Sequence, residues 1–447
     1  MTSTLDRPAA GDSYAAQVER LRAQYDAIPV GEPVRLAKKT SNLFRPRADT
    51  ERPGLDVAAF DGVLSVDPEA GTADVQGMTT YEHLVDATLP HGVAPLVVPQ
   101  LRTITLGGAV TGLGIESTSW RNGLPHESVL EMDVLTGAGQ VLTVSGRDDD
   151  PHRDLFHAFP NSYGSLGYVL RLRIEVEPVT RYVRLRHVPV GDAAGAATAL
   201  ARVVEHGAWD GEQVDFVDGM VFSPTEAYVT LGRYEDDARG QTPSDRTKAS
   251  IYYRSIQSER QDLLTTHDYL WRWDTDWFWC SRAFGAQQPL VRRLWPASRL
   301  RSDTYWKLVA LDRRTRFSAR LTAARRLPPR ENVVQDIEVP IGRLAEFLDF
   351  FHREIGISPV WLCPLRVRRP ARSWPLYVMD PDTAYVNVGF WSTVAVPHGV
   401  DPEEGAGEPP DRADGDRPRR SQVALLDRVL RSGRVRPRCT AAARTAK

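Results

Sequence analysis

Four glycines crowd the segment TLGGAVTGLGIES, residues 105–117, and constrain its backbone more than any other feature of the chain. Gly107, Gly108, Gly112 and Gly114 stand among small apolar residues, and glycine alone lets a backbone approach a bulky neighbour without an intervening Cβ. Consecutive N–H groups in such a loop form an anion-binding concavity. The segment therefore predicts either a phosphate-binding loop or a tightly packed structural turn.

The residues that follow exclude two common phosphate loops. A P-loop ends in Gly-Lys-Ser/Thr, whereas Gly114 is followed by Ile-Glu-Ser. A dinucleotide-binding Rossmann turn needs GxGxxG opening a helix, and the GLG run ending at Gly114 lacks the third glycine. Hydroxyl groups beside the glycines are able to donate to phosphate oxygens: Thr103, Thr105, Thr111 and Ser117. A phosphate-bearing cofactor and structural packing both stay open.

Composition indicates an ordinary globular chain. Its 447 residues are 42% hydrophobic and 26% charged, enough for a sizeable core and, at about 150 residues per domain, for two or three domains. The formal net charge of -2 provides no general attraction for nucleic acid or an anionic membrane. Cys280, Cys363 and Cys439 lie far apart, so neither a disulfide framework nor a metal site is expected.

The first thirty residues contain no apolar run of signal-peptide or membrane-span length. Together with the cysteine usage, this predicts a cytoplasmic protein without a transmembrane segment. Tyr14, Val18, Leu21 and Tyr25 recur at steps of three or four, which indicates an amphipathic helix near the N-terminus.

Short apolar runs broken by glycine predict an α+β region up to Pro178. Strands are expected at residues 63–66 and 73–75, followed by a helix capped by Thr80 and ended by Pro-His-Gly at 90–92. A hairpin is expected around residues 137–139. A short helix, a glycine turn and a long strand follow.

The second half alternates helical segments, at residues 195–207 and 341–356, with strands such as residues 220–234. Four tryptophans lie within nine residues: Trp271, Trp273, Trp277 and Trp279. Their spacing indicates either one face of a strand, lining a pocket for a flat ligand, or packing in the core.

Two long segments, residues 99–124 around the glycines and residues 154–178 with their GSLG turn, resemble the FAD-linked oxidase superfamily of the vanillyl-alcohol oxidase type. Within it, the chain is most similar to the delta-24 sterol reductase group. Four further segments share this resemblance: AKKTSNLFRPR (37–47), VVQDIEVP (333–340), PVWLCPL (359–365) and YVNVGFW (385–391). The resemblance therefore extends from about residue 30 to residue 391.

The resemblance implies an α+β fold, in which a PCMH-type FAD-binding domain of two subdomains carries an α+β cap domain for the substrate. The implied boundaries are an N-terminal helix at 1–29, the FAD-binding domain at 30–180, the cap at 181–391 and an atypical tail at 392–447.

The resemblance also implies which residues contact FAD: Thr105, Leu106, Gly107, Gly108, Ala109, Val110, Thr111, Gly112, Leu113, Gly114, Ile115, Glu116, Ser117, Ser165, Leu166, Gly167, Ser41 and Asn42. Lys38 and Lys39, beside Ser41, either bind the cofactor as well or are solvated. Many members of the superfamily attach FAD through a histidine or cysteine. Residues 105–117 contain no histidine and His126 lies beyond them, so noncovalent FAD is expected.

The implied activity is transfer of hydride from NADPH through FAD to the isolated C=C bond of a sterol, or of another prenyl or fatty-acyl lipid. The candidate proton donors are Tyr385 and Glu116. Each has an alternative role, since Tyr385 also suits a strand core and Glu116 also suits binding to backbone amides. Two other functions stay open: an FAD-dependent oxidase or dehydrogenase of an alcohol or lipid, and an inactive or flavin-free member of the family.

The last residues change character abruptly, because no Phe, Tyr, Trp or Ile follows Trp391. Residues 401–422 have the composition of a disordered segment. A permitted codon choice for residues 408–412, read one base later, gives Asn-Arg-Leu-Ile-Glu, and a similar shift of residues 422–430 gives a tyrosine-bearing segment that resembles the family. We therefore hypothesise a frameshift near residues 400–408, which resequencing would test and which would alter one wall of the cofactor site.

Overall fold

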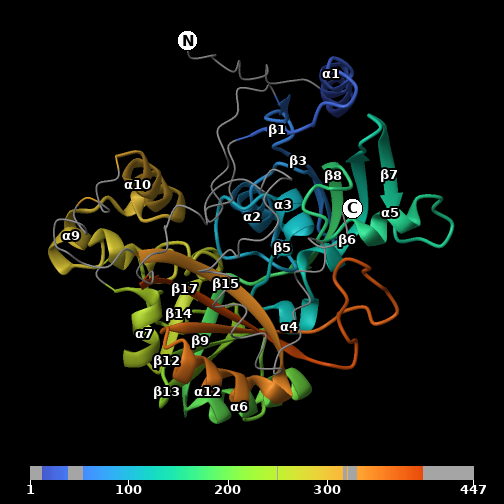
Figure 1. The fold of residues 1–447 in the computed structure, drawn as a ribbon. Coiled ribbons are helices and arrows are strands. Elements are labelled where there is room, and N and C mark those ends of the chain that lie inside the picture. Colours follow the sequence, from blue (N-terminus) through green and yellow to red (C-terminus); the bar gives the residue numbers. More distant parts are fainter. Residues whose placement is uncertain (1–12, 39–53, 249, 316–319, 321–329, 396–447) are drawn as a thin grey trace.

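The computed structural model describes residues 13–38, 54–248, 250–315, 320 and 330–395, and Figure 1 shows two large sheets stacked one above the other. The first sheet and its helices come from the N-terminal part of the chain, and the second comes from residues beyond Tyr182. This mixed architecture confirms the predicted α+β class.

The N-terminal helix α1 (Tyr14–Asp26) begins where the Ser13 side chain accepts a hydrogen bond from the Ala16 amide. Its apolar face buries Leu21 and packs on a small cluster together with Tyr14 and Tyr25, as the periodicity predicts. Two short parallel strands, β1 (Leu36–Ala37) and β2 (Leu55–Asp56), lie beside it.

The first large sheet has the order β3-β4-β8-β6-β7, and β5 also pairs with β8. Its strands are β3 (Val63–Asp67), β4 (Thr72–Gln76), β5 (Val93–Pro95), β6 (Val129–Leu135), β7 (Val141–Ser145) and β8 (Tyr168–Pro178). The predicted strands at residues 63–66 and 73–75 form as β3 and β4, and the predicted hairpin around residues 137–139 forms between β6 and β7. Helix α2 (Tyr81–Thr88) begins at Thr80, whose hydroxyl accepts from the His83 amide at 3.2 Å, and η1 (Leu89–His91) ends at Gly92 with φ 70°.

The second sheet is antiparallel throughout, with the order β14-β9-β13-β12-β16-β17-β15. Its strands are β9 (Tyr182–Gly191), β12 (Phe216–Ser223), β13 (Glu226–Glu235), β14 (Gln261–Thr265), β15 (Arg330–Pro340), β16 (Val360–Leu365) and β17 (Tyr385–Ala395). Helices α6 (Ala193–His206) and α12 (Leu344–Glu354) cover one face, where Val386 and Val388 of β17 are buried with them. Because side chains alternate along a strand, Tyr385, Asn387 and Trp391 point to the opposite face.

The remaining elements are mostly short, apart from the 14-residue helix α10. They are α3 (Leu106–Gly112), α4 (Ser119–Asn122), η2 (Pro125–Ser128), α5 (Arg153–Ala158), β10 (Ala208–Trp209), β11 (Glu212–Gln213), α7 (Tyr252–Ser258), α8 (Thr266–Leu270), η3 (Cys280–Phe284), α9 (Pro289–Leu294), η4 (Ala297–Arg299), α10 (Ser302–Thr315) and η5 (Ile341–Arg343).

The tryptophan-rich segment forms consecutive turns and no strand, so the interpretation as a strand face is wrong. Trp277 and Phe278 have positive φ values of 46° and 58°, which interrupt any extended run. Trp271 and Trp273 are each 1% exposed, and all four tryptophans belong to the main core cluster. Packing in the core, the alternative interpretation, is confirmed.

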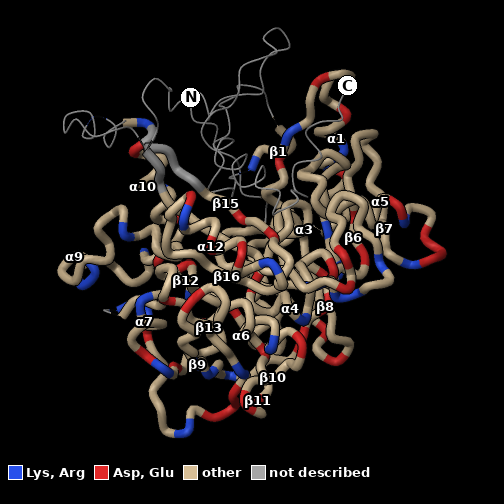
Figure 2. Tube along the Cα trace, turned by 60° about the horizontal axis from the view of Figure 1, so that its bottom comes forward, with Lys and Arg blue, Asp and Glu red and all other residues tan. Residues whose placement is uncertain are grey.

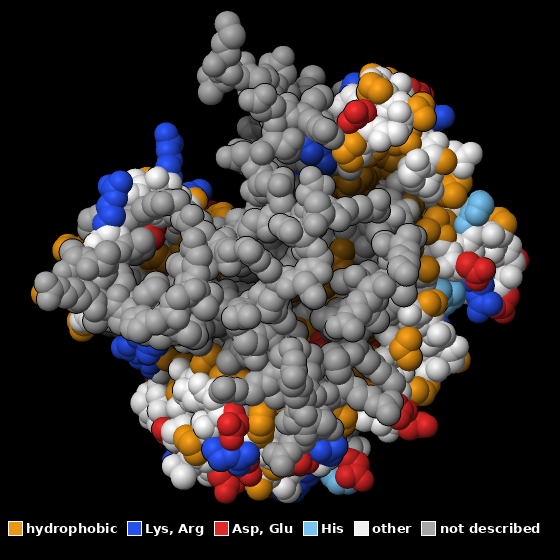
Figure 3. Space-filling view, viewed as in Figure 1, with side chains coloured by type: hydrophobic (Ala, Val, Ile, Leu, Met, Phe, Trp, Pro, Cys, Tyr) orange, Lys and Arg blue, Asp and Glu red, His pale blue; other side chains and the backbone are white. Residues whose placement is uncertain are grey.

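Acidic and basic residues are interspersed along the described chain (Figure 2), and both signs occur on the part of the described surface that Figure 3 shows, in keeping with the small net charge. Within the described part of the chain, no helix is both long enough and apolar enough to cross a bilayer. Strand β17 extends to Ala395, and residues 396–447 of the predicted tail lie outside the described residues.

Candidate functional site

The glycine-rich segment starts as a helix rather than as an open loop. Thr105 caps α3, because its hydroxyl accepts from the Gly108 amide at 3.1 Å. The amides of Leu106 and Gly107 donate to Thr79 and Gly77, both at 2.9 Å. The first N–H groups of α3 are thus already paired within the protein, and any ligand at this segment meets its later residues.

Glycines of the segment serve two different purposes. A Cβ added to Gly107 would lie 2.7 Å from the carbonyl oxygen of Gly77, so this glycine lets α3 pack directly on the sheet. A Cβ added to Gly112 would meet nothing nearer than the Tyr163 ring at 3.8 Å. Structural packing therefore explains Gly107, whereas the backbone at Gly112 is open to a close approach.

The turn that contains GSLG lies against the C-terminal end of α3. The Tyr163 amide donates to the Thr111 carbonyl at 3.1 Å, which joins the two predicted cofactor segments. Ser165 is exposed and its hydroxyl donates to the Ser162 carbonyl, Leu166 is half-buried, and Gly167 has φ 134°. Tyr163, which is 60% exposed beside Gly112, was not among the predicted site residues. Its one signal in the sequence is a bulky aromatic residue directly before a glycine turn.

The outer side of these two segments is partly exposed to solvent. Gly108, Thr111, Gly112, Leu113 and Ile115 are half-buried there, whereas Leu106, Ala109 and Val110 face the core. Gly114 is also half-buried, but a Cβ added to it would lie 2.7 Å from the Pro99 ring. Two buried hydroxyls beside this surface, Thr103 Oγ1 and Ser162 Oγ, have no hydrogen-bond partner among the described residues. Ser41 and Asn42 lie outside the described residues, so their predicted contacts stay predictions.

The glycine segment ends in a buried ion-pair network. The Arg272 guanidinium donates to Glu116 Oε1 at 2.7 Å and to Asp218 Oδ2 at 2.9 Å. Glu116 also accepts from the Ser117 amide at 2.8 Å, and the Ser117 hydroxyl lies 2.8 Å from the Tyr269 hydroxyl. The network therefore connects the end of the predicted flavin segment to strand β12 of the second sheet.

Electrostatics in this network are unusual because two carboxyl groups share one cation. Burial raises the pKa of Glu116; Arg272 opposes that shift and the nearby Asp218 adds to it. The Arg272 guanidinium also stacks 4.0 Å from the centre of the Tyr269 ring. Glu116 is 2% exposed, so its clearest contribution here is to hold the two parts together. Its predicted role as a proton donor remains a prediction.

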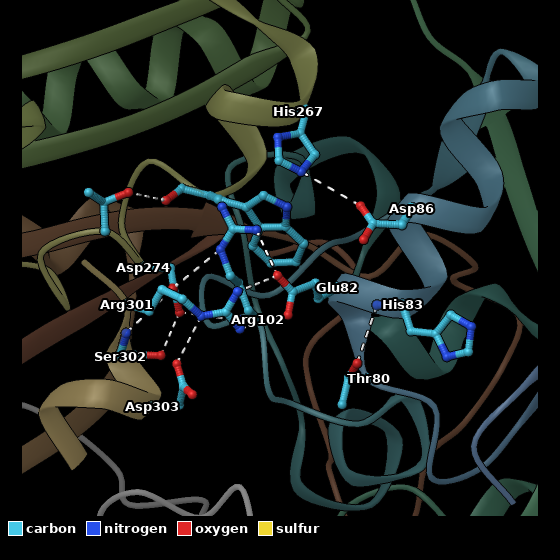
Figure 4. A network of polar contacts seen from close by, with 12 residues as sticks. Thr80, Glu82, His83, Asp86, Arg102, His267, Asp274, Arg301, Ser302 and Asp303 are labelled. Atoms are coloured by element: carbon cyan, nitrogen blue, oxygen red, sulfur yellow. Dashed lines mark hydrogen bonds and ion pairs between the residues drawn. The ribbon is translucent and has the colours of Figure 1, made fainter. Parts of the chain in front are cut away.

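A second polar network joins the same two parts of the molecule (Figure 4). Glu82 on α2 accepts from both terminal nitrogens of Arg301, at 2.6 and 2.7 Å, and from Arg102 at 3.0 Å. The amide of Arg102 and the hydroxyl of Ser302 both donate to the same oxygen of the fully buried Asp274. Arg102 therefore anchors the stretch just before the glycine segment.

Each of the two networks contains a charged residue of the tryptophan-rich segment. Arg272 and Asp274 alternate there with Trp271 and Trp273, and the sequence analysis did not single them out. Burying a charged side chain costs free energy unless the charge is paired. Charged residues between tryptophans that are expected in the core were therefore the available sign of buried ion pairs. The pairing partners come from distant parts of the chain, so only the tertiary structure identifies them.

Tyr385, the other predicted proton donor, begins strand β17 on the face opposite α6 and α12. It is half-buried, and its hydroxyl oxygen accepts from the Asp380 amide at 3.3 Å. Its assigned role also remains a prediction.

His126 is fully buried, and its ring centre lies 4.5 Å from that of Trp374 in an edge-to-face contact. Neither ring nitrogen has a hydrogen-bond partner among the described residues. Burial lowers the pKa of His126 to about 3. The folded protein therefore excludes a proton that the unfolded chain accepts below about pH 6.5, so stability falls as the pH drops.

Replacing His126 by Phe is expected to remove part of this acid sensitivity. Between pH 7 and pH 5 the wild type should lose about 2 kcal/mol more of its free energy of unfolding than His126→Phe, because only the wild type must exclude the proton. Urea unfolding at both pH values measures the difference. His206→Phe, at an exposed position at the end of α6, is the control and should behave as the wild type. Equal losses in wild type and His126→Phe would contradict the assignment.

Comparisons with known proteins support these observations. Residues 21–145, which include α3 and strand β4, match the model of an FAD-binding domain. The Delta(24)-sterol reductase of Arabidopsis thaliana is 26% identical over 351 residues, which are 74% of this chain and 60% of that protein. The Homo sapiens Delta(24)-sterol reductase is 25% identical over 75% of this chain and 63% of its own length.

Cytokinin dehydrogenase 6 of Oryza sativa subsp. japonica is 33% identical, over 33% of this chain and 27% of its own length. The chain thus spans about three fifths of the length of the sterol reductases that it matches. From the FAD-binding domain match, from these relatives and from the open surface where the glycine segment meets the GSLG turn, we conclude that the chain carries an FAD-binding domain and resembles the FAD-linked oxidases.

Proposed function

We propose that this protein is an FAD-dependent reductase, which takes electrons from NADPH and reduces an isolated C=C bond of a sterol or other lipid-like molecule. The observation that carries the proposal is the extent of the similarity. The sterol reductases match about three quarters of the chain, well beyond the FAD-binding domain, whereas the dehydrogenase matches one third.

Within this proposal the chain's own residues bind and orient the reactants. The surface around Gly112, Thr111 and Tyr163 receives the cofactor, and the network of Arg272 and Glu116 holds that surface against the second sheet. When bound, a reduced flavin supplies a hydride, so the substrate needs a proton from the protein.

The absence of histidine and cysteine from residues 105–117, and the enclosed position of His126, support noncovalent FAD. Acid precipitation should therefore release the flavin into the supernatant. Cys280 and Cys363 are free thiols, which supports the cytoplasmic location that we also propose.

An anaerobic experiment tests the proposed reaction. NADPH added to the purified FAD-loaded protein should bleach the flavin absorbance, and a Δ24 sterol in detergent should then restore it. Bleaching by an alcohol or a lipid alcohol alone would instead favour an oxidase or dehydrogenase, the activity class that the Oryza relative's name suggests. No flavin absorbance after incubation with FAD would favour an inactive member of the family.

A further inference from the structure

The face of the second sheet opposite α6 and α12 carries several carboxyl groups, and they differ in their partners. Asp218 on β12 is ion-paired with Arg272, and Asp262 on β14 is ion-paired with Arg246. Asp336 on β15 lies on the same face, since it pairs across the sheet with Gly389 and Val339 faces the other side. Among the described residues Asp336 forms no ion pair.

A neighbouring amide and a glycine orient Asp336. The Asn387 side-chain amide donates to Asp336 Oδ1 at 3.0 Å. A Cβ on Gly389 would lie 2.9 Å from that same oxygen, so the absence of a side chain at Gly389 lets the carboxyl group lean over β17. Asn387 is fully buried whereas the Asp336 side chain is exposed, and the carboxyl group is therefore both held and accessible.

This face of the sheet meets the FAD-binding domain. Trp361 and Trp391, which flank Gly389 there, belong to the same core cluster as Val110 of α3. Burial raises the pKa of the Cys363 thiol on β16, and the charges of Glu116 and, more weakly, Asp336 add to the shift. The charges of Asp336 and of Glu116, at the end of the glycine segment, therefore both act on the same thiol.

Asp336 has the properties of a group that keeps a proton. Although Asp336 keeps solvent-exposed surface, the protein packed around its carboxyl group raises the pKa by desolvation, and the hydrogen bond from Asn387 offsets that shift only in part. Glu116, in contrast, is enclosed and bound to Arg272, and the hydroxyl group of Tyr385 is engaged by a surface loop. An accessible acid that has no cation beside it among the described residues suits proton donation better than either.

We propose that Asp336, oriented by Asn387, is a catalytic residue that donates the proton to the C=C bond of the substrate. This inference rests on the proposed function, which supplies the hydride from a flavin reduced by a nicotinamide. The O–H bond of the Asp336 carboxylic acid breaks as a C–H bond forms at one alkene carbon, and the other carbon receives the hydride. A solvent proton then reprotonates the carboxylate, so each turnover consumes one hydride and one proton.

Half-reactions of the full chain loaded with FAD test the inference. Asp336→Asn keeps the shape and the hydrogen-bonding position but carries no acid. Flavin reduction by NADPH should be unchanged in this variant, because that step needs no proton from Asp336. Anaerobic reoxidation by a Δ24 sterol should slow by about 10²- to 10⁴-fold, the usual contribution of a general acid. Asp349→Asn, on the exposed side of α12, is the matched control and should reoxidise as the wild type does.

Reducing the flavin with dithionite makes the alkene step independent of NADPH. If the wild type is then reoxidised by the sterol and Asp336→Asn is reoxidised equally fast, the inference is overturned while the proposed function stands. If the sterol does not reoxidise the wild type, the proposed substrate class is wrong. The infrared measurement described next then tests, without turnover, whether Asp336 holds a proton.

Infrared difference spectra recorded over a pH titration detect the C=O stretch of a protonated carboxylic acid without any turnover. The wild type should show such a band persisting above the ordinary pH range of an aspartic acid, and Asp336→Asn should lack it while Asp349→Asn retains it. Identical spectra for wild type and Asp336→Asn would contradict the assignment.

Discussion

Replacing Arg272 by Met is expected to lower the free energy of unfolding by about 3 to 5 kcal/mol, the usual cost of removing one partner from a buried ion pair. The substitution leaves the carboxyl groups of Glu116 and Asp218 enclosed without their cation. One oxygen of each carboxyl group already has no hydrogen-bond partner among the described residues, so nothing nearby compensates. Urea unfolding of the purified protein measures the loss.

The control for this prediction is Arg186→Met, which breaks the half-exposed pair of Arg186 with Asp210. Such surface pairs contribute about 0 to 1 kcal/mol, because water screens them. Adding Glu116→Gln and Asp218→Asn to Arg272→Met should recover part of the lost stability, since the uncompensated charges disappear. Equal losses for the two arginine variants would show that the network stabilises little.

A second pair of variants separates packing from cofactor binding within the glycine segment. Gly107→Ala should lower the free energy of unfolding of the FAD-free protein by about 1 to 3 kcal/mol, since the new methyl group would press on Gly77 and Val169. Gly112→Ala should leave that stability unchanged or slightly raise it, because alanine favours the helix and its methyl group meets only the Tyr163 ring, at an ordinary contact distance of 3.8 Å.

The order of effects should reverse when FAD affinity is measured by the quenching of flavin fluorescence. Gly112→Ala should weaken binding at least about tenfold, equivalent to about 1.4 kcal/mol, because its methyl group occupies the surface where the cofactor approaches. Unchanged FAD affinity in Gly112→Ala would place the cofactor elsewhere, whatever the result for Gly107→Ala.

Much of the fold was predictable because its signals are local. Thr80 caps α2 and Gly92 follows its end, and the glycines near residue 138 mark the hairpin of β6 and β7. The glycine segment itself was recognised as special, but its start as a helix was not. Thr105 is an evident helix cap only once the chain before it is seen to be extended and the next amides are seen to pair with Thr79 and Gly77.

The candidate site was harder to predict because its members interact over long stretches of sequence. Tyr163 reaches Thr111 only because β8 brings the turn after α5 back to α3. Asp336 and Asn387 are 51 positions apart and meet only through the register of β15 and β17. A single aspartate within an otherwise ordinary strand gives no local sign of this pairing.

The amino-acid sequence by itself determined the α+β class, the family resemblance and the place of the glycine segment, since caps, turns and glycine requirements act within a few residues. The tertiary structure alone decided which glycine is used for packing and which leaves an open surface, and which acids have a cation. Those properties depend on neighbours that the fold brings together from distant positions, and burial sets the electrostatic cost of each group only when those neighbours are in place.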